Sequence, residues 1–327
     1  MSSTTDMQML RYVLTVIGHE AIDPATYLEL EHFIVSLPVK INKINVLSED
    51  RVFDFDVTLV KSELITSEAS EHTTVEDIKE AISECPLNEK LDIIFQKNDE
   101  FRQAKKLFCF DMDSTLIYQE VIELIAAYAG VEDEVEKITT AAMNGEIDFK
   151  ESLARRVKLL RGIDGTIWED LKKKLEFTKG DHELMKGLKK TGCKLAVLSG
   201  GFIPLASYVK DTLNLDYAFA NALKTETDPN GKVIFSGETE GYIVDGEKKA
   251  ELTIEIAKKE GIDLKAAVAV GDGSNDLKMM GVAGFGIAWN AKPKVQKLAP
   301  AKLNTDKISD IFYILGYNDE QIKALTA

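Results

Sequence analysis

The sequence predicts an α/β protein with a doubly wound, Rossmann-like parallel-sheet core, an inserted helical segment and a smaller ferredoxin-like domain in front. Three observations predict this class. From residue 106 onward, apolar strand-like runs alternate with helical patterns, except in the segment 118–178, which has helical patterns only. The first 97 residues follow the order β-α-β-β-α-β.

The N-terminal part has its own set of elements. We expect strands at 10–17, 41–48, 52–62 and 91–97, and helices at 24–36 and 74–84. In the third strand Phe53 and Phe55 alternate with Asp54 and Asp56, which indicates one buried and one solvated face. The polar stretch Ser67 to Thr74 is expected to be a long loop. Residues 1–97 therefore form a separate domain, and the charged segment 98–105 is the linker.

The core begins with the apolar run Leu107 to Phe110, which leads directly into Asp111. A short apolar run of this kind is typical of a strand that is covered on both faces. Later strands are expected at 194–199, 217–220, 266–271 and 284–289, with helices near 202–213, 248–261, 275–281 and 292–299. This alternation predicts a doubly wound parallel-sheet core over 106–327.

Two further segments complete the core. From about 118 to 178 the spacing of Val121, Leu124, Ile125 and Tyr128 is that of one helix stripe, so we expect an all-helical cap inserted there. The run Asp228-Pro-Asn-Gly231 predicts a hairpin turn. A C-terminal helix with Ile308, Ile311, Phe312 and Leu315 on one stripe is expected to pack against the core.

Composition excludes several classes of function. Lys and Arg number 40 against 55 Asp and Glu, giving a net charge of -15, so a nucleic acid or an anionic membrane surface is disfavoured as a partner. Three cysteines cannot all pair, which favours a reducing compartment. Four histidines without metal-ligand spacing give no support for a zinc site. Neither a signal peptide nor a membrane span is evident, so we expect a cytoplasmic protein.

Polar residues follow three of the predicted core strands. Asp111 and Asp113 follow the first, Ser199-Gly200-Gly201 the second, and Gly271 to Asp276 a later one. The carboxyl ends of parallel strands meet at one crevice, and carboxylates gathered there repel each other unless a divalent cation such as Mg²⁺ joins them. The alternative for Asp111 and Asp113 alone is a turn whose acids cap the next helix.

The spacing of the first two acids suggests a reaction. An aspartate can attack phosphorus and form an acyl phosphate, which divides one displacement into two easier steps. A second acid must protonate the leaving alkoxide and then activate water, a role that suits Asp113. The pair therefore predicts hydrolysis of a phosphate ester.

These residues resemble the haloacid dehalogenase superfamily and, within it, the phosphoserine phosphatase family, from about residue 106 to 317. The resemblance rests on Asp-Met-Asp-Ser-Thr at 111–115, Ser-Gly-Gly at 199–201, Lys249, and Gly-Asp-Gly-x-Asn-Asp at 271–276. It implies Asp111 as nucleophile and Asp113 as general acid/base. It implies one Mg²⁺ per site, held by Asp111, the backbone carbonyl of Asp113, and Asp272, with Asp276 in support. The implied ligands of the phosphate are Ser199, Gly200 and Lys249, and Asn275 is implied as a further substrate-binding residue.

The resemblance also implies the residues that hold the rest of the substrate. Glu120 matches the amine-binding glutamate, Arg156 the carboxylate-binding arginine, and Met143 and Phe149 the residues that close the pocket. From the residues alone, the favoured interpretations are that Glu120 is an ordinary acid of a helix's first turn, Arg156 a solvated charge and Phe149 a core residue. Lys248 and Lys249 both begin a helix, so Lys248 stays the alternative phosphate ligand.

The implied activity is Mg²⁺-dependent hydrolysis of O-phospho-L-serine to L-serine and phosphate, the last step of phosphorylated serine biosynthesis, through an aspartyl phosphate on Asp111. The alternative is a related phosphatase or phosphotransferase that acts on another small phosphomonoester. Residues 1–97 resemble the ACT-like domains of longer family members. Two roles stay open for them: a regulatory sensor that binds an amino acid, or a packing and dimerisation module that makes the protein a homodimer.

Overall fold

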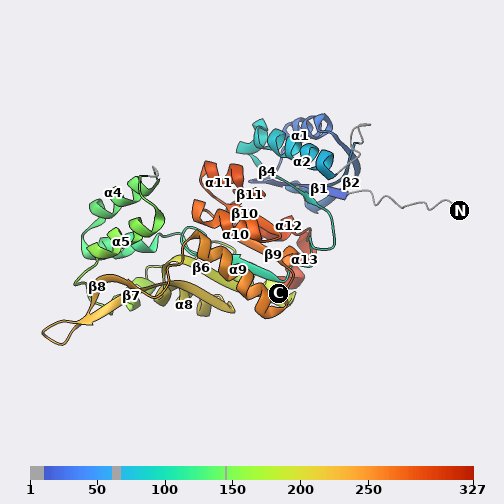
Figure 1. The fold of residues 1–327 in the computed structure, drawn as a ribbon. Helices are drawn as coiled ribbons and strands as arrows, with labels where there is room; N and C mark the ends of the chain where they lie inside the picture. Colours follow the sequence, from blue (N-terminus) through green and yellow to red (C-terminus); the bar gives the residue numbers. More distant parts are fainter. Residues whose placement is uncertain (1–10, 61–67, 144–145) are drawn as a thin grey trace. The chain divides into compact units, whose positions relative to one another are not determined.

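The computed structural model describes residues 11–60, 68–143 and 146–327 (Figure 1). The chain divides into two compact units. The smaller one joins Met1–Ala104 to Ala301–Ala327, and the larger one is Lys105–Pro300.

The smaller unit has an antiparallel sheet with the strand order β2-β3-β1-β4. Its elements are β1 (Arg11–Gly18), α1 (Pro24–Ser36), β2 (Val39–Ser48), β3 (Val52–Leu59), α2 (Glu68–Ser83) and β4 (Leu91–Lys97). Leu30 and Ile34 of α1 share a buried core with Ile78 of α2 and the inner face of the sheet. This order and pairing are those of the ferredoxin-like fold that the sequence predicts.

Two segments of the smaller unit compare the predicted with the observed secondary structure. The helix predicted at 24–36 has these bounds, because Asp23 caps it by accepting hydrogen bonds from Ala25 N and Thr26 N at 3.0 Å, and proline occupies its first position. The loop predicted from Ser67 to Thr74 is wrong from Glu68 onward, where α2 begins. Glu and Ala favour helix, and a polar stretch is therefore not by itself a loop.

The C-terminal residues belong to the smaller unit, whereas the sequence assigned them to the core. They form β11 (Ala301–Leu303), α12 (Ile311–Ile314) and α13 (Asp319–Thr326). The backbone N–H of Asn304 donates to Asp92 of β4 at 2.6 Å, and Arg102 donates to the carbonyl of Ile314 at 3.2 Å. The prediction that this segment packs against the core rested on an apolar stripe. Such a stripe indicates that one face of a helix is buried, but it does not indicate which part of the protein covers that face.

The larger unit contains a sheet with the order β10-β9-β5-β6-β7-β8, parallel except for the last pair. The strands are β5 (Leu107–Phe110), β6 (Lys194–Phe202), β7 (Tyr217–Thr227), β8 (Val233–Glu240), β9 (Ala267–Gly271) and β10 (Phe285–Trp289). The helices between them are α7 (Asp181–Lys190), α8 (Ile203–Thr212), α9 (Gly246–Glu260), α10 (Leu277–Val282) and α11 (Pro293–Leu298). The doubly wound core is thus confirmed. Within the described ranges, no helix combines the length and apolar character that crossing a membrane requires.

Between β5 and β6 lie four cap helices: α3 (Val121–Ala129), α4 (Glu132–Met143), α5 (Phe149–Leu159) and α6 (Trp168–Lys172). The β7–β8 hairpin leaves the core sheet and reaches these helices, as Figure 1 shows for α5. Its turn has the predicted form, with Gly231 N donating to the carbonyl of Asp228 at 2.9 Å. Because the predicted strand stopped at residue 220, this reach was not expected.

Backbone hydrogen bonds fasten the hairpin to the loop that follows α5. The amide of Gly162 donates to Phe235 O at 2.9 Å, Phe235 N donates to Ile163 O at 2.9 Å, and Gly165 N donates to Val233 O at 3.0 Å. The rings of Trp168 and Phe235 lie 5.5 Å apart. The cap is therefore helical with a β-hairpin attached to it.

Candidate active site

Strand β5 places Asp111 at the carboxyl edge of the sheet. The strand lies between β9 and β6, and all four of its residues are buried. Asp111 N donates to Val270 O of β9 at 2.9 Å, so the parallel pairing continues one residue past the strand. The carboxylate then accepts a hydrogen bond from Met112 N at 2.7 Å. The Asp111 carboxylate is therefore buried and held in one orientation.

Strand β9 brings two more acids to the same edge. Ligand atoms of Asp111, Asp272 and Asp276 all lie within 4.8 Å of one another. Burial, and after it the nearby Asp111, raises the pKa of Asp272 to about 7 and that of Asp276 to about 8. A Cβ atom at Gly271 would overlap the Asp276 carboxylate, so glycine is required for this close approach. Three hard oxygen donors that repel one another fit a divalent cation.

Lys249 is the buried cation of the site. Its Nζ lies 2.7 Å from Asp111 Oδ1 and 2.7 Å from Asp276 Oδ1, and the side chain is fully buried. Burial alone would lower the pKa of Lys249, but the two carboxylates more than offset it and raise that pKa. Lys248 points elsewhere and pairs with Glu251 and Glu255 on the exposed side of α9. The geometry thus separates two lysines that the sequence left as alternatives.

Asp113 and Glu120 are acids whose surroundings favour the protonated form. Burial, followed by repulsion from Glu120 and Asp111, raises the pKa of Asp113 well above that of an ordinary carboxyl. Its Oδ2 accepts a hydrogen bond from Val121 N at 3.1 Å, while Oδ1 has no partner within the described part of the chain. Burial also raises the pKa of Glu120, although Ser114 Oγ donates to its Oε1 at 2.8 Å and opposes this. A protonated Asp113 can give its proton to a leaving group.

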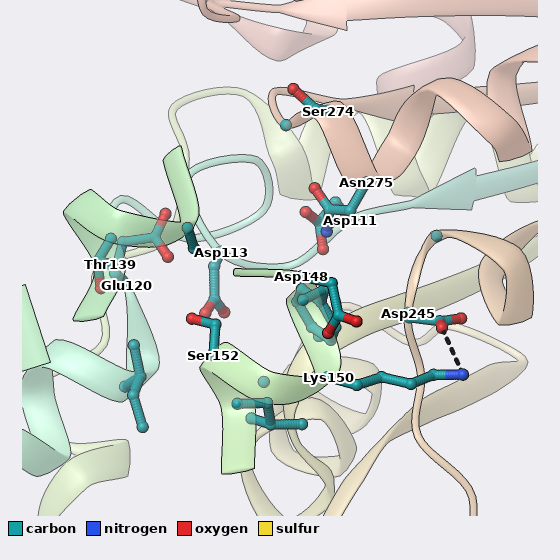
Figure 2. A pocket seen from close by; sticks show the side chains of 18 of the residues that line it. Asp111, Asp113, Glu120, Thr139, Asp148, Lys150, Ser152, Asp245, Ser274 and Asn275 are labelled. Carbon is teal, nitrogen blue, oxygen red and sulfur yellow. Dashed lines mark ion pairs between the residues drawn. The ribbon is translucent and has the colours of Figure 1, made fainter. Parts of the chain in front are cut away.

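A cavity of about 710 Å³ lies over these acids, between the sheet edge and the cap (Figure 2). A Cβ atom on Gly200 would lie 3.1 Å from Phe149 Cζ, so the Phe149 ring sits directly on the Gly200 backbone. Lys150, next to Phe149 in α5, pairs with Asp245 at 3.1 Å, and Asp245 caps the helix that carries Lys249. The cap and the core are therefore joined at the edge of the cavity.

Arg156 reaches the same cavity from α5. Burial lowers its pKa, and the carboxylates of Glu120 and Asp113 oppose this effect. Its Nε donates to Ser152 O at 3.4 Å, and no ion pair to it is found within the residues that the structure describes. A guanidinium in this state can bind an anionic group.

The carboxyl-terminal part of β6, from Ser199 to Gly201, provides polar groups without charge. Ser199 is fully buried, and its Oγ accepts a hydrogen bond from Gly201 N at 2.8 Å. The carbonyl of Gly200 accepts from Asn221 Nδ2 at 2.8 Å, and Asn221 Oδ1 accepts from Val244 N at 2.8 Å. Asn221 thus ties this end of β6 to the chain just before α9.

Known proteins share this arrangement. The haloacid dehalogenase-like hydrolase family matches residues 105–284. The phosphoserine phosphatase of Saccharomyces cerevisiae is 59% identical over 233 residues, which cover 71% of this chain and 74% of that protein. The chain belongs to the phosphoserine phosphatase family.

Two further relatives agree. A probable phosphoserine phosphatase of Schizosaccharomyces pombe is 46% identical over 252 residues, 77% of this chain and 84% of that protein. A solved structure described as a phospho-aspartyl intermediate analogue of phosphoserine phosphatase superposes with a TM-score of 0.59 at 42% identity, covering 64% of this chain and 98% of its own. The family predicted from the motifs is confirmed.

Most residues that the family resemblance implied lie around the one cavity. Asp111, Asp113, Glu120, Phe149, Arg156, Gly200, Asp272 and Asn275 line it directly. Lys249 and Asp276 lie beneath it through their contacts with Asp111 and Gly273, and Ser199 lies beside it through Gly201. The side chain of Met143 lies outside the described residues. The metal-binding role of the Asp113 carbonyl remains a prediction.

Several residues at this phosphatase site were not found from the sequence. Asn221 had one usable signal, because it is a polar residue directly after an apolar strand run. Lys150 and Asp245 had none, since nothing in a single sequence shows that a surface-like lysine meets an aspartate 95 positions later. Lys292, which lines the cavity from the start of α11, was missed for the same reason.

Gly201 leaves room for the side chains of Ser199, Met112 and Asp113, and its replacement by alanine should impair the enzyme. The new Cβ would lie 3.0 Å from Ser199 Oγ, 3.2 Å from Met112 Cε and 3.4 Å from Asp113 Oδ1. Because Ser199 and Met112 are buried and must shift beside Asp113, we expect kcat to fall at least about tenfold, with about 1–3 kcal/mol of stability lost. Steady-state kinetics and thermal unfolding measure the two effects.

Gly281→Ala is the matched control, since no atom lies within 4 Å of a Cβ at that helical position. It should keep the parent's kcat and gain about 0.5–1 kcal/mol of stability. Equal kcat values for Gly201→Ala and the parent would contradict the steric account.

Proposed function

We propose that the protein is a Mg²⁺-dependent phosphoserine phosphatase that hydrolyses O-phospho-L-serine to L-serine and inorganic phosphate. One observation carries this proposal: the cavity that holds Asp111 and Asp113 also holds an acid, Glu120, and an arginine, Arg156, for which the described residues form no ion pair. A substrate with a phosphate, an ammonium and a carboxylate matches these groups. The 59% identity to the yeast phosphoserine phosphatase supports the same substrate.

In the first step, Asp111 Oδ attacks phosphorus and the bond from phosphorus to the serine oxygen breaks. The leaving alkoxide takes the proton of Asp113, whose raised pKa keeps that proton available. Lys249, 2.7 Å from Asp111, provides a fixed positive charge beside the transferring group. An aspartyl phosphate and free serine result.

In the second step, water attacks the aspartyl phosphate while Asp113, now ionised, accepts a proton from that water. The acyl phosphate bond breaks and Asp111 is regenerated. Asp111, Asp272 and the Asp113 carbonyl would hold Mg²⁺, with Asp276 in support. When bound, Mg²⁺ offsets negative charge on the phosphoryl oxygens.

Arg156→Ala tests the substrate assignment. Loss of the guanidinium should lower kcat/KM for phosphoserine by about 10- to 100-fold, because a charge-assisted contact to the substrate carboxylate disappears. Turnover of 4-nitrophenyl phosphate, which has no carboxylate, should change by less than about threefold. The measurement is phosphate release with both substrates in the presence of Mg²⁺.

Arg155→Ala is a matched control, since Arg155 is exposed and pairs with Glu151 on the outer side of α5. If the Arg156 variant lost the two activities equally, Arg156 would not select phosphoserine. If the parent released phosphate equally fast from phosphoserine, phosphothreonine and the aryl phosphate, the enzyme would be a general phosphatase.

We propose that the smaller unit is an ACT-like module and that the protein works in the cytoplasm. The ferredoxin-like strand order and the position before the catalytic part support the first proposal. Its role as amino-acid sensor or as dimerisation module is separated by titrating the whole protein calorimetrically with L-serine and by measuring its mass in solution. Because serine is also the expected product, the titration is repeated with Arg156→Ala, and only heat that persists in this variant is assigned to the smaller unit. Heat without a change in mass favours the sensor, and a dimer without heat favours the module.

A further inference from the structure

Ser152 has a buried hydroxyl on the cavity wall for which the described residues provide no hydrogen-bond partner. It lies in α5, its residue is 1% exposed, and its Oγ contacts no donor or acceptor in the described part of the chain. It lines the cavity with Asp113 and Arg156, and Figure 2 draws its side chain among those around the pocket. None of the roles given above uses this hydroxyl.

The local structure explains why the hydroxyl stays free. A serine within a helix usually donates to the carbonyl four residues earlier, which here is that of Asp148. That carbonyl accepts from the backbone N–H of Ser152 at 2.9 Å, and the hydroxyl does not share it. A buried hydroxyl without a partner destabilises a protein, so its presence on a cavity wall points to a partner that arrives with the ligand.

We infer that Ser152 Oγ donates a hydrogen bond to the carboxylate of bound phosphoserine, next to Arg156. Ser152 and Arg156 stand four residues apart on α5 and therefore on one face of the helix. The contact from Arg156 Nε to Ser152 O at 3.4 Å holds the guanidinium beside this turn. The inference deepens the proposed function and rests on it.

The chemistry of the other groups leaves the carboxylate as the acceptor. The phosphate end belongs to Asp111 and Lys249 on the core side, and Glu120 is the acid for the substrate ammonium. A carboxylate offers about four lone-pair sites, of which a guanidinium uses two, so a hydroxyl donor can be added without displacing Arg156. Ser152 is then a specificity-determining residue that touches the substrate.

One competing acceptor is within the cavity: Asp113 Oδ1, which also has no described partner. A bond from Ser152 to Asp113 would affect every substrate, whereas a bond to the substrate carboxylate affects only substrates that have one. O-phosphoethanolamine keeps the phosphate and the ammonium of phosphoserine and lacks the carboxylate. Comparing the two substrates therefore distinguishes the acceptors.

The test is Ser152→Ala in the full-length, Mg²⁺-loaded enzyme, with kcat and KM measured for both substrates. We expect kcat/KM for phosphoserine to fall about tenfold and that for phosphoethanolamine to stay within about twofold. The midpoint of thermal unfolding should not fall, because the removed hydroxyl has no hydrogen-bond partner among the residues that the structure describes. Ser236→Ala is the matched control: its Oγ is another buried, unpartnered hydroxyl, but Ser236 does not line the cavity.

Equal losses on the two substrates would overturn the inference in favour of a role through Asp113, and no loss on either would overturn it outright. A tenfold loss in the Ser236→Ala control would also overturn it, because the effect would then follow from deleting any such hydroxyl. Failure of the proposed function would appear separately, as a parent enzyme that does not prefer phosphoserine to phosphoethanolamine.

Discussion

Replacing Asp111 by asparagine should lower kcat/KM for phosphoserine by at least about 10⁴-fold, because an amide oxygen cannot form the acyl phosphate. The variant should still fold, since asparagine keeps an oxygen that can accept from Met112 N, and Lys249 keeps Asp276 as a partner. Phosphate release measures the activity. Mass spectrometry of the acid-quenched enzyme should find a phosphorylated Asp111 peptide in the parent only.

Asp211→Asn, at an exposed position where the aspartate pairs only with Lys210 among the described ion pairs, should match the parent in both measurements. An Asp111→Asn enzyme within tenfold of the parent would show that another residue is the nucleophile. So would a phosphopeptide that did not contain position 111.

Asp113→Asn should lower steady-state kcat by about 10²- to 10⁴-fold with phosphoserine, since both chemical steps lose their proton carrier. The rates of the two chemical steps need not fall equally. Nitrophenolate leaves without protonation, so with 4-nitrophenyl phosphate the variant should release about one equivalent of nitrophenolate rapidly and then stall as the aspartyl phosphate. Rapid-mixing absorbance measures this burst, and phosphoserine should give no burst of serine.

The pH dependence of the first step follows from the same residue. The pKa of Asp113 is raised, so the protonated form that serves as the acid is present below this raised pKa and is lost as the pH rises through it. Single-turnover transfer from phosphoserine should therefore slow at higher pH in the parent. The asparagine variant should lack this decline, and a decline of equal size in both proteins would assign the effect to another group.

Much of the fold could be predicted because local signals agreed with the final packing. The runs that became β5 and β9 are apolar throughout and are buried on both faces. Helix α7 was missed because six of its ten residues are charged or histidine, although Leu184, Met185 and Leu188 form a buried stripe. A short amphipathic helix rich in lysine is difficult to distinguish from a loop.

The site was predictable where motif residues are adjacent in sequence and not where distant residues meet. Lys248 and Lys249 are adjacent residues of the same type, so the sequence does not distinguish them. Because consecutive side chains of a helix point about 100° apart, only Lys249 faces Asp111. The pairing of Lys150 with Asp245 and the fixing of Gly200 by Asn221 depend on tertiary structure. Each joins elements whose proximity only the folded sheet and cap determine.

The β7–β8 hairpin has a consequence for how serine leaves. Three main-chain hydrogen bonds attach it to the loop after α5, and its other end continues into the core sheet through β7. If the cap opens with these bonds intact, β7 must bend, and the irregular register between Leu223 and Thr225 is the place where its pairing with β8 is already interrupted. The elastic stiffness of this ribbon, far from any reacting atom, then limits how wide the exit becomes and how quickly the product departs.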